Sequence, residues 1–272
     1  MKIKKLVNIE FYKILKRKES ILLIGMIILP LLYGFGFKSG SSSFQYNGNG
    51  RIACLDWVQI MCNMMSQVSI FYIFMSIISV RSLSNEIEDS SIHLYIHRVN
   101  SRKKIYRSKF FALLTYLFIS FTIFIMGSVL CYFTLMKDVT NISSNKFWAD
   151  AYSAECIMII IEMFISFVFM ISLSLLLSTY FKPLVCVAIT LLEHIVSLFV
   201  SQLSYVCYIS PWFYYNRLLD NITADENSVG NTKLAFFSDN NLIIFASCIV
   251  IYVIFIAGMN YLGEKKFVEE DL

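Results

Sequence analysis

Apolar residues fall along this chain in blocks of about twenty, separated by short polar stretches. Six such blocks cover residues 20–37, 57–80, 110–136, 151–178, 183–206 and 242–262. At about 1.5 Å per residue, a helix over each block crosses a hydrocarbon core of about 30 Å. Helices satisfy every backbone N–H and C=O group internally, as lipid requires. The pattern predicts an all-α integral membrane protein with six transmembrane helices, forming a single domain over residues 1–272.

Residues 1–19 show a different pattern. Apolar side chains recur at helical spacing along one face, and lysines lie mostly on the other. The apolar face consists of Ile3, Leu6, Val7, Phe11, Ile14 and Leu15. Such a helix is typical of the membrane interface, with its lysines at anionic headgroups. It is either a topology anchor or an elbow helix that also contacts a cytoplasmic partner.

Composition and charge further restrict the kind of protein that this chain can be. The chain is 57% hydrophobic and 15% charged, which excludes a pair of ordinary soluble domains. Of its 23 Lys and Arg residues, 17 fall on one side of the predicted spans, and the six on the other side are Lys38, Arg51, Lys137, Lys146, Arg217 and Lys233. Basic residues favour cytoplasmic segments. Both termini are therefore predicted to be cytoplasmic, in the cell membrane of a bacterium.

The loop over residues 81–109 is the longest on the predicted cytoplasmic side. Its first part carries Glu86, Glu88 and Asp89, and its last part carries several basic residues. Ser84 or Asn85 is expected to cap a helix whose first turn carries these carboxylates, since acidic groups suit a helix N-terminus. That helix would have Ile87, Ser91, Leu94 and Tyr95 on one face. The alternative is a solvated loop that merely follows the charge rule.

The six-span layout and this loop resemble permeases of the type-2 ABC exporter family, also called the type V exporter fold. In that family the loop commonly carries two glutamates one residue apart, then Gly-Thr, a leucine-rich helix, Pro-x-Arg or Pro-Ser-Arg, and a Lys that opens the third span. This chain matches the pattern at Glu86, Glu88, Leu94, Ile96, Ser101, Arg102 and Lys109, and departs from it at Ser90, Ser91 and Asn100.

The resemblance implies a coupling helix, at about residues 84–98, that docks on a separate ABC ATPase. The coupling residues would be Glu86, Glu88, Ser91, Leu94, Tyr95 and Arg102. It also implies two ATPase copies, a second permease that is identical or related, and a re-entrant hairpin between spans five and six. The substrate would be an antimicrobial peptide, a drug or another amphiphile, as in the immunity and efflux branch. By the same resemblance Gln59, Asn63, Ser66 and Gln67 would line the translocation path.

Nucleotide chemistry and other catalytic motifs are missing from the sequence. No G-x-x-x-x-G-K-[ST] loop occurs, so ATP and Mg²⁺ are expected on the partner ATPase and no cofactor on this chain. No G-x-S-x-G or H-E-x-x-H motif occurs either, and the chain is predicted not to be an enzyme. His93 and His97 are four residues apart, without a third metal ligand nearby. They are interpreted as a solvated helix face, and no metal site is predicted.

Three carboxylates and one histidine fall within the predicted spans: Glu155, Glu162, Glu193 and His194. Ionisable groups in a membrane are costly and indicate function by default. Glu162 and Glu193 either line a polar path for a cationic substrate or hydrogen-bond between helices as protonated carboxyls. With His194 they support an alternative function, an ion-coupled secondary transporter or channel. Of the seven cysteines, Cys54 and Cys207 lie on the predicted outer side, where they could pair.

Overall fold

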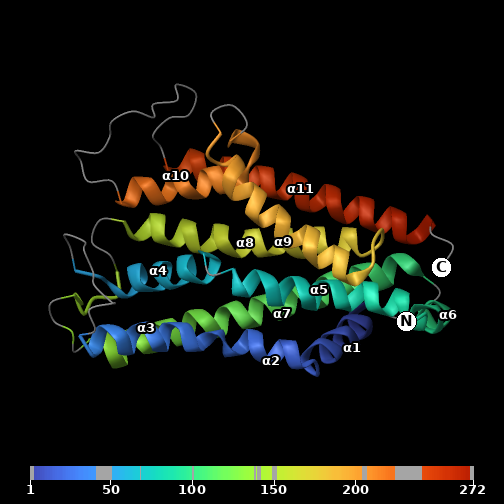
Figure 1. Ribbon diagram of the computed structural model, residues 1–272, viewed down its shortest axis with the longest axis horizontal. Helices are drawn as coiled ribbons and strands as arrows, with labels where there is room; N and C mark the ends of the chain where they lie inside the picture. The colour runs from blue at the N-terminus through green and yellow to red at the C-terminus, as the bar shows by residue number, and fades with distance from the viewer. Residues whose placement is uncertain are drawn as a thin grey trace.

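The computed structural model describes residues 3–40, 51–67, 69–99, 101–137, 139, 142–148, 152–203, 207–223 and 241–269. Within these ranges the secondary structure is helical, apart from an isolated bridge between Ile52 and Ser143. Long helices run side by side and form an elongated bundle (Figure 1). Five helices are long and apolar enough to cross a membrane, or six if one bent pair counts as a single span. The architecture agrees with the predicted all-α membrane protein.

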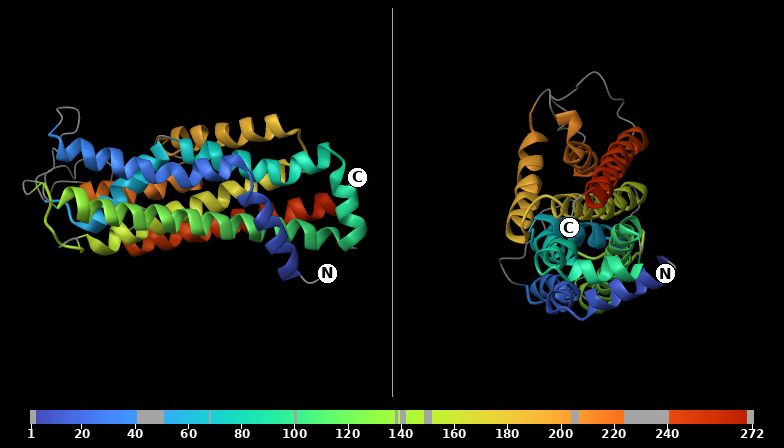
Figure 2. Two further views of the ribbon diagram at one scale, coloured as in Figure 1. Left: turned by 90° about the horizontal axis from the view of Figure 1, so that it is seen from below. Right: turned by 90° about the vertical axis from the view of Figure 1, so that its right-hand side faces the viewer.

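The first span is preceded by a separate amphipathic helix, as predicted. Helix α1 (Ile3–Leu15) lies obliquely across one end of the bundle (Figure 2). The span itself consists of α2 (Lys18–Ile24), a 3₁₀ turn (Gly25–Ile27) and α3 (Ile28–Lys38). Pro30 has no N–H for the carbonyl four residues earlier, which belongs to Met26 in the 3₁₀ turn. The proline thus accounts for the interruption of a segment expected to be one helix.

The second span is bent, where the sequence predicts one continuous helix over residues 57–80. It consists of α4 (Cys54–Gln67) and α5 (Ile70–Glu88), whose axes differ by 63°. Ser69 takes the left-handed conformation with φ of 57°, and its N–H donates to the Ser66 carbonyl at 3.0 Å. This local bond ends the regular pattern of α4, and α5 begins in a new direction.

The coupling loop also differs from its prediction. Helix α5 continues through Glu86 and Glu88, so these carboxylates lie in a last helical turn rather than a first one. Ser90 has φ of 56°, and the short helix α6 (Ser91–Val99) follows it. The expected cap at Ser84 or Asn85 is wrong because apolar positions such as Leu83 stay buried and keep α5 regular past them.

The remaining helices complete the bundle. They are α7 (Arg102–Cys131), continued by a π-helical turn (Tyr132–Met136), then α8 (Ser153–Leu177), α9 (Pro183–Val200), a 3₁₀ turn (Cys207–Ile209), α10 (Pro211–Thr223) and α11 (Asn241–Glu269). Helix α10 packs against α8, α9 and α11. The rest of the predicted hairpin between spans five and six, residues 224–240, lies outside the described residues.

Helix α8 is the centre of the bundle and packs against α4, α5, α7, α9, α10 and α11. Its Phe167 is fully buried, with ring centroids of Phe71 and Tyr72 at 4.4 and 4.7 Å. Helices α1 and α6 and the last turns of α11 lie together at one end (Figure 1). We call this the terminal end.

Candidate functional site

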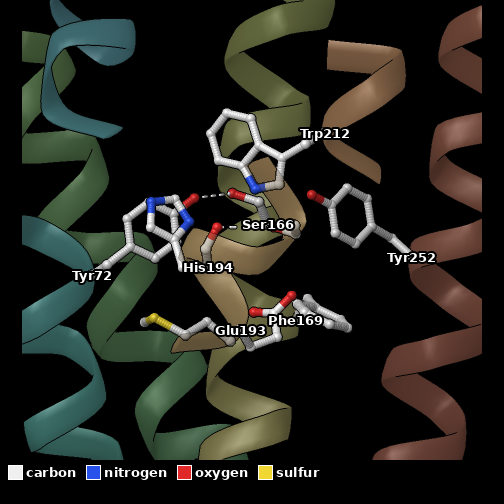
Figure 3. Close-up of a pocket in the computed structure, with 9 residues that line it drawn as sticks. Tyr72, Ser166, Phe169, Glu193, His194, Trp212 and Tyr252 are labelled. Carbon is white, nitrogen blue, oxygen red and sulfur yellow. Dashed lines mark hydrogen bonds between the residues drawn. The ribbon is translucent and has the colours of Figure 1, made fainter. Parts of the chain in front are cut away.

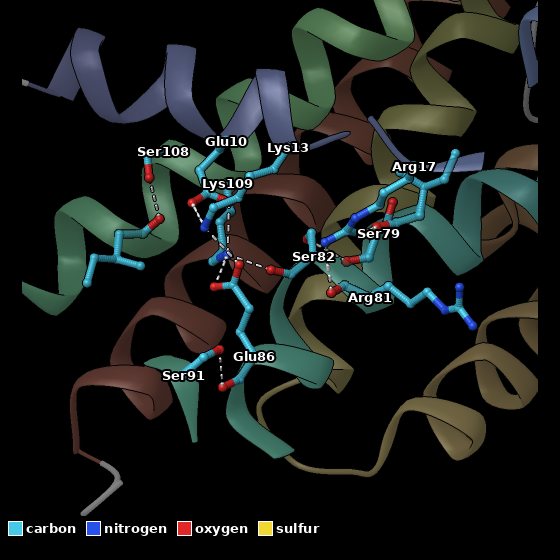
Figure 4. A network of polar contacts seen from close by, with 12 residues as sticks. Glu10, Lys13, Arg17, Ser79, Arg81, Ser82, Glu86, Ser91, Ser108 and Lys109 are labelled. Atoms are coloured by element: carbon cyan, nitrogen blue, oxygen red, sulfur yellow. Dashed lines mark hydrogen bonds and ion pairs between the residues drawn. The ribbon is translucent and has the colours of Figure 1, made fainter. Parts of the chain in front are cut away.

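Four charged side chains form a closed ring at the terminal end, which we call the charge cluster: Glu10, Lys13, Glu86 and Lys109 (Figure 4). The Lys13 ammonium lies 3.0 Å from a carboxylate oxygen of Glu10 and 3.0 Å from one of Glu86. The Lys109 ammonium lies 3.0 Å from the other oxygen of Glu10 and 2.7 Å from the other oxygen of Glu86. The ring joins α1, α5 and α7, because each carboxylate is held by both ammonium groups.

Lys109 is the buried member that holds the charge cluster together. Its side chain is 0% exposed, and that of Glu10 is 3% exposed. The ammonium also donates to the Ser82 carbonyl, so its three N–H groups have three separate acceptors. A buried charge is tolerated when it is paired and its hydrogen bonds are satisfied. The arrangement meets both conditions.

The electrostatics of α1 follow from this pairing. Burial alone would raise the pKa of the Glu10 carboxyl, but the nearby Lys109 and Lys13 ammonium groups hold that pKa below its usual value. Burial would lower the pKa of Lys13, and the carboxylates of Glu10 and Glu86 instead raise it. Both groups are therefore held in their charged forms near neutral pH.

Helix α6 is attached to the charge cluster by two contacts. The Tyr95 ring centroid lies 4.5 Å from the Lys13 ammonium, a cation–π distance. The Ser91 hydroxyl donates to the Glu86 carbonyl at 3.3 Å. Three predicted coupling residues, Glu86, Ser91 and Tyr95, thus meet around one cluster.

The other predicted coupling residues lie elsewhere. Glu88 is exposed and is not part of the cluster. Arg102 donates to the Val268 carbonyl at 3.2 Å and so ties the start of α7 to the end of α11. The backbone of Leu94 lies within α6, but its side chain is outside the described part of the structure.

Arg17 extends the cluster toward the membrane. Its guanidinium donates to the backbone carbonyls of Ile78 and Arg81, both at 3.3 Å. Arg81 in turn pairs with Glu19 at the start of α2. Helices α1 and α2 are therefore fastened to α5 along several turns.

A second polar site, which we call the membrane pocket, lies within the bundle. It is lined from α5, α8, α9, α10 and α11 by Tyr72, Ser166, Phe169, Met170, Glu193, His194, Ser197, Trp212 and Tyr252. Figure 3 shows the Tyr252 hydroxyl directed toward the centre and the Glu193 carboxylate at the lower edge. The pocket volume is about 10 Å³, close to the least that holds one water molecule.

The side of the pocket that α5 forms is rigidly built. The Tyr72 hydroxyl lies 2.9 Å from the Ser166 hydroxyl, and the Ser166 hydroxyl donates to the Met163 carbonyl at 2.7 Å. Tyr72 must therefore be the donor in the first bond. The His194 ring stacks on Tyr72 with centroids 3.8 Å apart and an interplanar angle of 20°. These contacts fix one wall of the pocket across α5, α8 and α9.

The two membrane glutamates have different surroundings. Glu162 is 1% exposed, and one of its oxygens accepts from the Cys248 thiol at 2.7 Å. Its other oxygen has no hydrogen-bond partner among the described residues. Glu193 lies partly exposed on α9 and faces the pocket. The third carboxylate, Glu155, accepts from the Asn241 amide at 3.1 Å near the start of α8.

The four predicted path residues on α4 do not line the membrane pocket. Gln59 and Ser66 are buried between helices, whereas Gln67 is exposed and donates to Asn63 at 3.3 Å. Neither Cys54 nor Cys207 forms a disulfide bond. Within the described ranges, no group of three or more His, Cys, Asp or Glu side chains could hold a metal ion.

Three members of the charge cluster and most of the pocket were not among the predicted site residues. Glu10 is the only acidic residue among the first 18, and this isolated acid in a basic helix was the available signal. No protein-family model, curated protein or solved structure matches the chain. The charge cluster and the membrane pocket are therefore the features of the chain that bear on its function.

Proposed function

We propose that this chain is the permease subunit of an ATP-driven exporter of the type-2 ABC class, with ATP hydrolysed on a separate ATPase subunit. The observation that carries the proposal is the meeting of α1, α5, α6 and α7 at the charge cluster (Figure 4). A permease driven from outside the membrane needs a rigid junction between a surface helix and its spans. The cluster supplies one, with α6 as the surface helix.

Helix α5 would carry the motion from this junction into the membrane. Glu86 near its end belongs to the charge cluster, and Tyr72 near its start belongs to the membrane pocket. The two residues are about 21 Å apart along the axis, at 1.5 Å per residue. A displacement of α6 by the ATPase would move α5 as a rod and change the wall of the pocket.

The proposed transporter has a defined membrane, a defined orientation in it and defined partner subunits. The terminal end would face the cytoplasm of a bacterial cell, and α1 would lie at the inner surface of the membrane with its lysines on anionic headgroups. Two ATPase subunits and a second permease, identical or related, would complete the transporter. The substrate would be an antimicrobial peptide, a drug or another amphiphile.

The direct test is a reconstitution with a candidate ABC ATPase subunit. The two proteins are co-expressed, purified through a tag on the permease, and assayed for ATP hydrolysis in proteoliposomes. We expect a stable complex whose ATPase rate depends on the permease. Tyr95→Ala together with Ser91→Ala should uncouple the ATPase while the permease stays folded.

A matched control separates coupling from general damage. Phe147→Ala changes an exposed aromatic residue outside the terminal end and should leave the complex unchanged. A permease that never binds an ABC ATPase, or that keeps full function when residues 91–99 are replaced by a Gly-Ser linker, would overturn the proposal.

The membrane pocket favours a second candidate function, an ion-coupled secondary transporter or channel. Glu193 and His194 lie together in the pocket, and Glu162 is a further buried carboxyl. This function predicts that Glu162→Gln and Glu193→Gln abolish ion-dependent uptake into proteoliposomes without any ATPase. Transport that requires ATP and survives both substitutions would exclude it.

A further inference from the structure

The Glu193 carboxylate has no counter-charge among the described residues. It faces the membrane pocket from the middle of α9, and within the described residues it has no ion pair and no hydrogen-bond partner. Glu10 and Glu86, by contrast, are each paired with two lysines. An unpaired carboxylate inside a membrane protein is costly, and a cation that reached it would offset that cost.

The rest of the pocket suits a nitrogen cation with several N–H donors. Trp212, Phe169 and Tyr252 supply aromatic rings around it, and a ring face attracts a cation. Figure 3 shows the Tyr252 hydroxyl directed toward the centre of the pocket and the Ser166 hydroxyl directed toward that of Tyr72. Ser166 gives its own proton to Met163 and receives one from Tyr72, which leaves an oxygen lone pair for a further donor.

The size of the pocket restricts the cation. Its volume of about 10 Å³ accommodates one water-sized group. A primary ammonium head is of that size and carries three N–H donors. A trimethylammonium head is much larger and has no N–H donor. Volume and hydrogen bonding therefore both favour a primary ammonium head over a trimethylammonium head.

An apolar surface adjoins the pocket. Val196 lies one helical turn after Glu193 on the same side of α9 and is 44% exposed, and the neighbouring Leu192 is 60% exposed. An alkyl chain could lie along this face while its head occupied the pocket. The two surfaces together match an amphiphile with a small cationic head.

We propose that the membrane pocket binds the ammonium head of a primary alkylamine, with Glu193 as its counter-charge and the alkyl chain along the exposed face of α9. The proposed binding follows from the pocket itself and does not require the proposed transport function. Only the further statement that such an amine is the exported substrate rests on the proposed function. Because the binding assay contains neither ATPase nor ATP, its failure would not bear on the association with an ATPase.

The first experiment measures head selectivity on the unmodified full chain. Radiolabelled dodecylammonium is bound to the purified protein in detergent, and unlabelled dodecylammonium, dodecyltrimethylammonium and dodecanol compete for it. We expect the other two to compete at least about tenfold more weakly, the usual size of a lost charged hydrogen bond. Equal competition by dodecanol or by dodecyltrimethylammonium would overturn the proposal, since the pocket would then not recognise the small cationic head.

The second experiment tests the counter-charge with a matched pair of variants. Glu193→Gln should weaken dodecylammonium binding by about 10- to 100-fold. Glu155→Gln, which alters a span carboxylate bonded to Asn241, should leave it unchanged. Tyr252→Phe should weaken binding less than Glu193→Gln does. It provides a second test of the pocket if Glu193→Gln fails to fold. Unchanged binding in both pocket variants would overturn the proposal.

The same chemistry occurs in the ethanolamine headgroup of membrane lipids. Nanodiscs of phosphatidylcholine with and without phosphatidylethanolamine distinguish the two sources. Loss of dodecylammonium binding in the nanodiscs that contain phosphatidylethanolamine would identify the lipid head as the natural occupant. Equal binding in both sets would assign the pocket to a free amine.

Discussion

The carboxylates of the charge cluster and of the membrane pocket have opposite surroundings. In the cluster, Glu10 and Glu86 share two lysines, and Lys109 has an acceptor for each of its donors. In the pocket, Glu193 has no counter-charge among the described residues. The first arrangement stabilises a junction between helices. The second leaves an interaction to be completed by a ligand.

This difference in pairing distinguishes charges that stabilise the fold from a charge that is available to a ligand. A satisfied ion network holds three helices in fixed positions, and removing one member leaves each of its partners with one counter-charge instead of two. A lone carboxylate contributes little to folding, because nothing in the chain depends on it. Substitutions at the two sites should therefore change different properties of the protein.

The largest effect is expected from Lys109→Met. It leaves Glu10 and Glu86 without their buried partner and should lower the free energy of unfolding by about 3–5 kcal/mol. Chemical unfolding in detergent micelles, followed by circular dichroism, measures the change. Lys104→Met, at an exposed position of the same helix, is the matched control and should have little effect.

Combining Lys109→Met with Glu10→Gln and Glu86→Gln should recover much of the lost stability, because no unpaired charge then remains buried. If the single Lys109→Met variant were as stable as the Lys104→Met control, the charge cluster would not be the junction described above.

A smaller loss is expected when the pocket loses a neutral hydrogen bond. Tyr72→Phe removes the 2.9 Å bond to Ser166 and keeps the ring stacked on His194. It should lower the free energy of unfolding by about 1 kcal/mol. Tyr12→Phe, at an exposed position of α1, is the control. If Tyr72→Phe lowered the free energy of unfolding as much as Lys109→Met, the charge cluster and the membrane pocket would not differ in their importance for stability.

The contribution of the charge cluster to stability should be lost both in acid and in alkali. Glu10 has a folded pKa below its reference value of 4.5, so its contribution to stability is full above pH 4.5 and is lost as pH falls through the folded pKa. The difference in unfolding temperature between the wild type and Glu10→Gln should therefore close in acid.

Lys13 has a folded pKa above its reference value of 10.5, so its contribution is full below pH 10.5 and is lost as pH rises through the folded pKa. Its variant Lys13→Met should converge with the wild type in alkali. If the unfolding temperatures of wild type and variant differed by the same amount at acid, neutral and alkaline pH, these side chains would stabilise the fold by packing rather than by charge.

The smallest effect on folding is expected from Glu193→Gln. No described group pairs with this carboxylate, and its unpaired charge is itself costly, so the substitution should not lower the free energy of unfolding by more than about 0.5 kcal/mol. Thermal unfolding of the detergent-solubilised protein measures it. A marked destabilisation would place Glu193 in the same structural class as Glu86 and contradict its role as an open site.

Much of the fold followed from hydrophobic pattern, because helices that cross lipid need long apolar segments. The blocks at 110–136 and 151–178 correspond closely to α7 with its π turn and to α8. The bend at Ser69 and the late start of α6 were not predictable from the same pattern. They depend on left-handed backbone conformations at two serines, which hydrophobicity does not register.

The candidate sites were predictable only in part. Glu86 and Glu193 were identified because charge is rare in and beside membrane spans. The lysine partners of Glu86 were not identified, because the charge cluster joins residues far apart in the chain, such as Glu10 and Lys109, which are 99 residues apart in sequence. The residues expected on α4 to line a path are separated from the pocket by the bend, which brings α5 rather than α4 to it.

The sequence by itself determined that the chain is helical, membrane-embedded and sparing in charge, because the hydrocarbon core selects both composition and helix length. Only the tertiary structure decided which charges are paired. That outcome depends on distances of about 3 Å between helices far apart in the chain, and no local pattern encodes such a distance. The same packing brought Glu10 and Glu86 to their lysines and left Glu193 facing an open pocket.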